Sequence, residues 1–257
     1  MAEADFVQQG DELGALTVLL EDVEVVYRVY QDRRAGLREI VARRGAPRPS
    51  IEIHALRGVS LTACQGEAIG VVGRNGSGKS TLMQAIAGAL PVTRGRVLAS
   101  GQPMLLGVGA ALKPNLSGER NVTIGLLALG LSRQQVREVH PEVVEFSGLG
   151  EALHRPMRTY SSGMRARLHF AISTAVVPEI LLLDEALAVG DREFKMRSRE
   201  RIDQLRAEAG TVFLVSHDLK EIEDSCQRAI WLHDGRIARD GVVTEVLDAY
   251  QQSTGGG

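Results

Sequence analysis

Short apolar runs separated by longer amphipathic segments recur along most of this chain. Residues 68–72, 180–183 and 211–215 are compact, mainly apolar runs, which is the pattern of strands buried on both faces of a parallel sheet. Residues 192–209 and 242–251 have the longer periodicity of helices. Strands alternating with helices predict an α/β fold with a mostly parallel sheet covered on both faces.

The first quarter of the chain has a different pattern. Residues 16–27 alternate partly and are rich in Val and Leu, so they predict a strand, and residues 56–63 resume strand character. Residues 28–55 read as a basic insertion between these strands. Two closely spaced prolines, Pro47 and Pro49, exclude a helix near its end.

A long, mostly helical stretch lies between two segments of the predicted sheet. It covers about residues 110–178, with helix breaks expected near Gly130, Pro141, Gly148 and Pro156. Because apolar strands precede and follow it, we expect this stretch to form an inserted helical subdomain.

Composition narrows the functional class. The formal net charge of −2 gives no reason to expect a nucleic-acid partner. No run approaches the roughly eighteen apolar residues that span a bilayer. Residues 1–10 lack the apolar core of a signal peptide, so we expect a cytoplasmic protein. Cys64 and Cys226 share no metal-ligand spacing and are expected to be reduced structural thiols.

Residues 73–80 carry the strongest chemical signal. The run is Gly73, Arg74, Asn75, Gly76, Ser77, Gly78, Lys79 and Ser80, and it matches the phosphate-binding pattern G-x-x-x-x-G-K-S/T between a strand and a helix. Its glycines let backbone N–H groups turn toward phosphate oxygens, and the helix N-terminus adds positive potential. In this pattern Lys79 reaches the β- and γ-phosphates, Ser80 offers a hydroxyl to Mg²⁺, and Thr81 can donate to the α-phosphate. We therefore predict binding of ATP with Mg²⁺.

Two acidic residues follow the apolar run at 180–183. Asp184 and Glu185 stand at the C-terminal edge of a predicted strand, where Asp184 can hold a Mg²⁺-bound water. Glu185 then points at the γ-phosphate and can polarise the attacking water. His217 ends another predicted strand on the same sheet edge, and the residue pattern alone leaves a structural role open for it.

A further segment, residues 160–168, reads Tyr-Ser-Ser-Gly-Met-Arg-Ala-Arg-Leu. Ser161 supplies a hydroxyl, Ser162 follows it, and Gly163 leaves the backbone open at a predicted helix start, which is a second anion site. Taken alone, the segment also fits an ordinary helix cap. It resembles the signature of ABC ATPases, usually Leu-Ser-Gly-Gly-Gln, with Tyr, Ser and Met replacing Leu, the first Gly and Gln.

The resemblance to ABC ATPases extends over nearly the whole chain. Pro178-Glu179 resembles the proline loop, the segment ending at Asp191 resembles the D-loop, and residues 215–218 resemble the switch segment. The resemblance implies that His217 contacts the γ-phosphate. One part departs from the family pattern, because no Gln follows the predicted strand at 104–108.

The family implies a fold and an assembly. The expected fold is a single P-loop NTPase domain over residues 1–257, with a mostly parallel sheet, an antiparallel β subdomain and an inserted helical subdomain. The expected assembly is a homodimer in which the signature residues of one chain serve the phosphate loop of its partner.

Several departures resemble the ATPases of polysaccharide exporters. They are Tyr-Ser-Ser-Gly-Met at 160–164, Leu-Leu-Gly-Val-Gly-Ala-Ala-Leu at 105–112 and Leu-Ser-Gly-Glu-Arg-Asn-Val at 116–122. The resemblance implies an ATPase at the cytoplasmic face of the membrane, bound to a permease dimer that handles a lipid-linked glycan. We expect no C-terminal carbohydrate-binding domain. The alternatives are an ABC ATPase for another lipid or a drug, and a non-transport ABC regulator.

Two expectations concern the first strand and the insertion. Tyr27, or next Tyr30, is expected to stack on adenine, although a core position is equally compatible with the pattern. In residues 31–44 the apolar Leu37, Ile40 and Val41 are spaced for one helix face among several arginines. This segment is expected to form a gate-like helix against the membrane side of the permease, the alternative being a solvated insertion.

Overall fold

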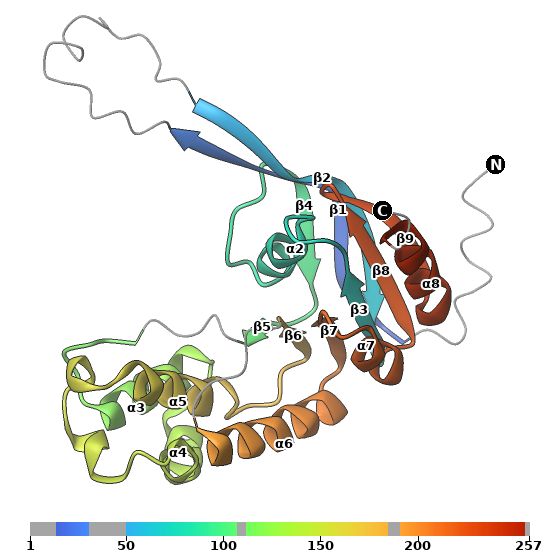
Figure 1. Cartoon of the computed structure of the whole chain (residues 1–257). Coiled ribbons are helices and arrows are strands. Elements are labelled where there is room, and N and C mark those ends of the chain that lie inside the picture. Colours follow the sequence, from blue (N-terminus) through green and yellow to red (C-terminus); the bar gives the residue numbers. More distant parts are fainter. Residues whose placement is uncertain (1–13, 31–49, 107–111, 185–190, 255–257) are drawn as a thin grey trace, which may run out of the picture.

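The protein is built on a six-stranded sheet that is parallel except at one edge. The computed structural model describes residues 14–30, 50–106, 112–184 and 191–254 (Figure 1). The strand order is β5-β6-β7-β3-β8-β9. The strands are β3 (Ala68–Val72), β5 (Pro103–Leu106), β6 (Ile180–Leu183), β7 (Thr211–Val215), β8 (Arg228–His233) and β9 (Arg236–Val242). Every residue of β6 and β7 is buried, as expected for central strands covered on both faces.

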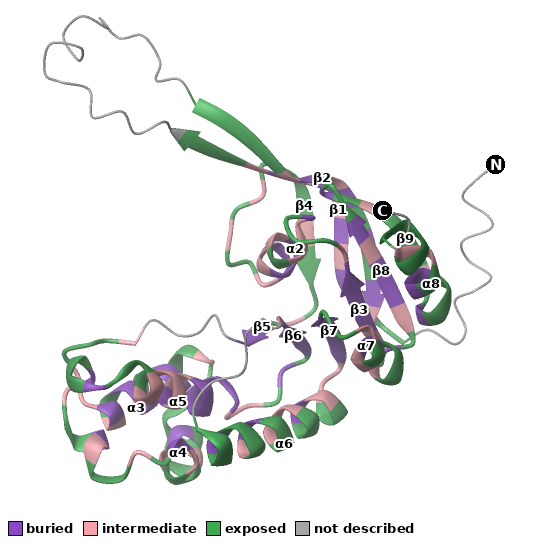
Figure 2. Cartoon of the chain, in the orientation of Figure 1, coloured by how far each residue is buried: buried purple, intermediate pink, exposed green. Residues whose placement is uncertain are grey.

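A second, three-stranded antiparallel sheet has the order β2-β1-β4. Its strands are β1 (Leu16–Tyr30), β2 (Ser50–Cys64) and β4 (Arg94–Ala99). The outer ends of β1 and β2 continue as a two-stranded ribbon that projects from the rest of the molecule and is largely exposed (Figures 1 and 2).

Both ends of the expected insertion, residues 28–55, belong to this ribbon. Residues 28–30 and 50–55 belong to paired strands, so β2 begins six residues before the predicted start at Leu56. An ion pair between Arg28 and Glu52, with 3.1 Å between Nε and Oε1, joins the two strands. The segment expected to form a gate-like helix lies outside the described residues.

Helices fill the interval between β5 and β6. They are α3 (Gly118–Ala128), α4 (Arg133–Ser147), two short 3-10 helices, η1 (Gly150–His154) and η2 (Met157–Thr159), and α5 (Ser162–Ser173). They enclose a separate apolar cluster that includes Val122, Leu126, Leu153, Leu168 and Ile172. The predicted fold class is therefore confirmed, including the antiparallel sheet and the inserted helical layer.

The predicted helix break at Pro141 is wrong. Pro141 lies inside α4, although an interior proline costs a helix about 3 kcal/mol. The helix starts with a reciprocal cap, in which the Ser132 side chain accepts from Gln135 N and the Gln135 side chain accepts from Ser132 N. Val136 and Val143 are buried on either side of the proline, and this packing offsets its cost.

The hairpin that ends in β9 was not predicted. Asp234 and Gly235 separate β8 from β9, and both have positive φ, 46° and 77°. Two consecutive residues with positive φ form the turn that matches the twist of a two-stranded hairpin, and Asp-Gly is its favoured sequence. The dipeptide was therefore an available signal for the antiparallel edge strand.

The remaining helices cover the two faces of the parallel sheet. On one face α2 (Lys79–Ile86) packs with the antiparallel sheet, burying Leu82 and Met83 in the first core cluster. On the other face lie α6 (Arg192–Glu208), α7 (Leu219–Ser225) and α8 (Val243–Thr254). Within the described ranges, no helix has the length and apolar character needed to cross a membrane.

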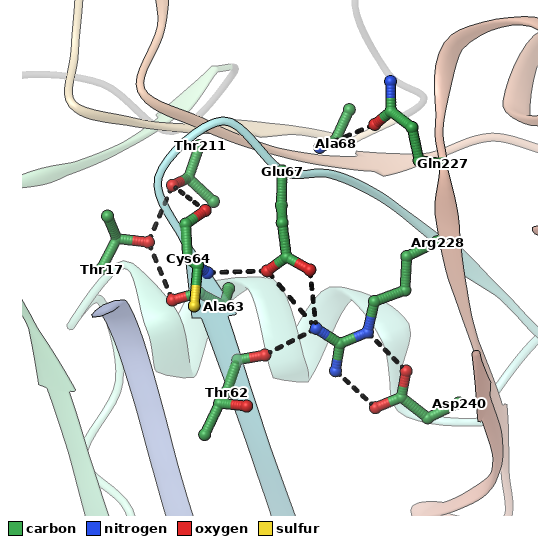
Figure 3. Close-up of polar contacts among 10 residues, drawn as sticks. All are labelled: Thr17, Thr62, Ala63, Cys64, Glu67, Ala68, Thr211, Gln227, Arg228 and Asp240. Atoms are coloured by element: carbon green, nitrogen blue, oxygen red, sulfur yellow. Dashed lines mark hydrogen bonds and ion pairs between the residues drawn. The ribbon is translucent and has the colours of Figure 1, made fainter. Parts of the chain in front are cut away.

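A polar network joins the two sheets near the start of β3 (Figure 3). The Arg228 guanidinium forms two hydrogen bonds of 2.7 Å with the Asp240 carboxylate and donates to Glu67 and to the carbonyl of Thr62. The Asp240 carboxylate most strongly, and the Glu67 carboxylate in addition, raise the pKa of Arg228 against the opposing effect of burial. The network links β2 of the antiparallel sheet to β8 and β9 of the six-stranded sheet.

Candidate functional site

The loop between β3 and α2 has the backbone of a phosphate-binding loop. Gly78, the N-cap of α2, has φ of +106°, and a Cβ there would lie 2.5 Å from the carbonyl oxygen of Ala55. Gly73 has φ of +154°, and a Cβ there would collide with the Leu232 carbonyl and the Ser77 hydroxyl. These positions therefore require glycine, for conformation and for space.

The first turn of α2 directs positive groups into this loop. Because the N-cap is glycine, no side chain caps the helix N-terminus, whose N–H groups favour an anion. Lys79 Nζ donates to the carbonyl oxygens of Gly73 and Arg74, at 2.7 and 3.1 Å. Ser80 and Thr81 follow in the same turn. The loop, the ammonium group and the hydroxyls together suit a polyphosphate.

Parallel pairing brings two further predicted residues to the same edge. Val71 of β3 is level with Val215 of β7, and Leu183 of β6 is level with Leu214. Asp184 therefore leaves the sheet one residue beyond Leu183, and His217 leaves it two residues beyond Val215. Both stand at the C-terminal edge where the phosphate loop begins, which is where ligands bind in open α/β sheets.

Two adjoining cavities lie along this edge. One, of about 650 Å³, is lined by residues that include Gly73, Lys79 and His217. Its wall also contains Tyr250 and Thr254 of α8, which no sequence motif indicated. The other, of about 790 Å³, includes Asp184 and again His217. His217 is thus shared by the phosphate-loop side and the Asp184 side of the edge.

The start of α5 forms a separate site in the helical layer. Ser161 is the N-cap, and its hydroxyl accepts from Met164 N at 3.2 Å; Ser162 and Gly163 form the first turn. Ser161 and Gly163 line a cavity of about 520 Å³. This cavity shares no lining residue with the one that contains Lys79.

Tyr160 occupies the position before this helix start as a structural residue. Its ring is buried, and its hydroxyl donates to the carbonyl of Ala152 at 2.7 Å. Desolvation raises the pKa of Tyr160. The tyrosine thereby ties the start of α5 to η1, a role that the sequence pattern did not indicate.

Asp191 connects α5, the helix that begins at Ser161, to α6. Its carboxylate caps α6 by accepting from Phe194 N at 3.0 Å, and it pairs with Arg167 of α5. The Arg167 guanidinium also lies over the Phe194 ring, 5.2 Å from its centroid. The Phe194 N–H, with a further contribution from Arg167, lowers the pKa of Asp191. Asp191 is thus placed on the wall of the Ser161 cavity.

Two predicted features cannot be placed at the edge. Glu185 and the loop at 107–111, where a family glutamine is missing, lie outside the described residues.

Tyr27 lies on the exposed ribbon, opposite Ile53 of β2, and 42% of its area is accessible. A core position for Tyr27 is therefore wrong.

Comparisons with known proteins agree with this geometry. A family model described as "ABC transporter" matches residues 56–188. The teichoic acids export ATP-binding protein TagH of Staphylococcus saprophyticus is 36% identical over 92% of this chain and 89% of its own length. The protein of the same name from Listeria monocytogenes is 35% identical over 92% of this chain and 70% of its own length.

Solved structures show the same fold. An ATP-binding cassette in a dimeric post-hydrolysis state with ADP and Pi matches with a TM-score of 0.64 and 22% identity, covering 88% of this chain and 98% of that one. The ATP binding subunit of an ABC transporter matches with a TM-score of 0.65 and 21% identity, covering 93% of each chain. At these identities the likeness concerns the fold alone.

The two phosphate-loop glycines with different surroundings give a matched test. We expect Gly78→Ala to lower ATP affinity by about tenfold or more, because its Cβ meets the Ala55 carbonyl and an L-residue is strained at this φ. Gly76→Ala is the control, since Gly76 also has positive φ but a Cβ there meets no atom within 4 Å. Titration with a fluorescent ATP analogue measures both variants. Equal affinities in the two variants would contradict the steric argument.

Proposed function

Because this chain belongs to the ABC transporter family, we propose that it is the ATP-hydrolysing subunit of an exporter for a lipid-linked polysaccharide. As a member of this family the chain is an ATPase. The observation that supports the proposal is the common C-terminal edge of β3, β7 and β6, since the phosphate loop, His217 and Asp184 each follow one of these strands.

In the proposed site each residue at this edge has one task. Lys79 and the N-terminus of α2 bind the β- and γ-phosphates, while Thr81 donates to the α-phosphate. Mg²⁺ prefers oxygen ligands; the Ser80 hydroxyl in the first helical turn would bind it directly, and the Asp184 carboxylate at the strand end would hold a Mg²⁺-bound water. Mg²⁺ bound with the nucleotide neutralises charge on the phosphates. Glu185 polarises the attacking water, and His217 contacts the γ-phosphate.

We propose that each complete site needs two copies of the chain. Ser161 and Gly163 form a helix N-terminus suited to a phosphate, yet their cavity shares no residue with that of Lys79. A second copy can bring its Ser161, Ser162 and Gly163 against the γ-phosphate on this phosphate loop. The D-loop residue Asp191 then lies at the same dimer interface.

Tyr27 is the proposed platform for adenine. It pairs across the ribbon with Ile53, and Ala55, two residues farther along β2, lies against Gly78 of the phosphate loop. The ring is therefore exposed, on a strand whose partner β2 approaches the phosphate loop. A flat aromatic surface at this position suits a purine base.

The proposed substrate is a glycan carried on a lipid, of the galactan, teichoic-acid or O-antigen type. Its support is the match to teichoic acids export proteins over most of both chains. The chain would act on the cytoplasmic face of the membrane, bound to a permease dimer. Residues 31–44 are proposed to contact that permease near the membrane.

A mixing experiment tests the two-copy site. Ser161→Arg and Lys79→Ala should each abolish ATP hydrolysis, because each variant spoils both sites of its own homodimer. In a mixed dimer one site keeps Lys79 from one chain and Ser161 from the other. Equal mixing should thus restore about a quarter of normal turnover, since half of the dimers are mixed and each has one of two sites intact.

The contrary result is equally specific. If each chain holds a complete site, the mixture contains no intact site and hydrolysis stays at the level of the separate variants. Mixing either variant with itself is the control for changes caused by concentration or handling.

Depletion in cells tests the substrate. When the protein is depleted, we expect an undecaprenyl-linked glycan to accumulate on the cytoplasmic side, because its synthesis continues while export stops. Extraction of lipid-linked glycans followed by mass spectrometry identifies the polymer. Restoration by the normal chain, but not by Lys79→Ala, would link accumulation to ATP hydrolysis; unchanged glycans with accumulation of another lipid would favour a different substrate.

A further inference from the structure

The Ser216 side chain forms a hydrogen bond to the backbone on the other side of His217. Asp218 N donates to Ser216 Oγ at 3.1 Å, which bridges the backbone across His217. The same hydroxyl donates to Glu221 Oε2 at 2.8 Å. Ser216 is buried, with 9% of its area accessible. The backbone that carries His217 is therefore fixed through the Glu221 carboxylate.

Glu221 lies in α7, whose N-terminus is capped by Asp218, the residue after His217. It lies in the first turn of α7, where Asp218 is the N-cap and accepts from Lys220 N and Glu221 N. In an ordinary capping box the third residue's carboxylate returns to the N-cap N–H. Here the Ser216 hydroxyl accepts from Asp218 N and donates to the Glu221 carboxylate. The cap therefore also fixes Ser216, the residue before His217.

Arg206 extends this connection to α6. Its guanidinium lies 3.7 Å from Glu221 Oε1, and 19% of the side chain is exposed. α6 begins directly after the segment that contains Glu185 and Asp191. Arg206, Ser216 and Glu221 all line the cavity of about 790 Å³ that also contains Asp184 and His217. An ion pair thus joins α6 to α7, the helix that directly follows the loop carrying His217.

We propose that Glu221, held by Arg206, is a positioning residue for ATP hydrolysis that orients His217 through the Ser216 hydroxyl. The inference rests on the proposed role of His217 at the γ-phosphate. Removing the Glu221 carboxylate releases the Ser216 hydroxyl and lets the His217 backbone relax. Binding of ATP depends on the phosphate loop, which Glu221 does not contact, so the loss should fall on turnover.

The test uses the full chain, four single variants described here, and His217→Ala with and without Glu221→Ala. Glu221→Ala removes the acceptor, and Ser216→Ala removes the bridging hydroxyl by deleting one oxygen. Glu221→Gln is the conservative variant, because its amide oxygen can still accept from Ser216. Glu223→Ala, on the exposed face of α7, is the matched control. For each variant, kcat and KM for ATP and the unfolding midpoint are measured.

We expect Glu221→Ala and Ser216→Ala to lower kcat by about 10-fold to 100-fold, the size seen when a functional side chain loses the group that orients it. KM for ATP should stay within about twofold, and Glu221→Gln should recover most of the turnover. In a His217→Ala background, Glu221→Ala should cause no further loss, because the two changes act through one group. Glu223→Ala should behave as the unsubstituted protein.

Other outcomes overturn the inference. Normal kcat in Ser216→Ala would do so even if Glu221→Ala failed to fold. A full additional loss in the His217→Ala background would show that Glu221 acts through another group. Absence of ATP hydrolysis by the unsubstituted chain, or hydrolysis that survives Lys79→Ala, would instead contradict the proposed function itself.

Discussion

Parallel hydrogen bonding among β3, β7 and β6 is the constraint on which the candidate site depends. β3 lies more than 100 residues before β6 and β7 in the sequence, yet the three strands end at one level, because Val71 pairs with Val215 and Leu183 with Leu214. A one-residue slip in either pairing would turn every side chain on that strand to the opposite face. The buried apolar residues of these strands therefore fix the position of Lys79, Asp184 and His217 together.

The second group of functional residues depends on different contacts. Ser161 and Gly163 are carried by the helical layer, which has its own apolar cluster. Arg167 and Asp191 join that layer to α6, and Arg206 and Glu221 join α6 to the loop of His217. In the proposed dimer, Ser161 and Gly163 of a chain act at one nucleotide, whereas Asp184 and His217 of the same chain act at the other. These two ion pairs are among the polar contacts that connect them within a chain.

The sequence was informative wherever local chemistry demands particular residues. The phosphate loop needs glycine at positions of positive φ and tight packing, as at Gly73 and Gly78, and the apolar runs identify buried strands by composition alone. Other features depend on tertiary context. The continuation of α4 through Pro141 follows from packing on both sides, and the bond between Ser216 and Glu221 follows from how α7 meets β7. The β9 hairpin is different, because its Asp-Gly turn is a local signal in the sequence.

In the proposed site the Asp184 carboxylate at the end of β6 acts, across β7, on the metal carried by phosphates at the end of β3. Electron paramagnetic resonance of Mn²⁺ can measure this directly, because Mn²⁺ takes the same oxygen ligands as Mg²⁺. In Asp184→Asn, Mn²⁺ affinity in the presence of ATP should fall by about tenfold or more, while metal-free ATP affinity stays normal. Unchanged Mn²⁺ affinity in this variant would contradict the account.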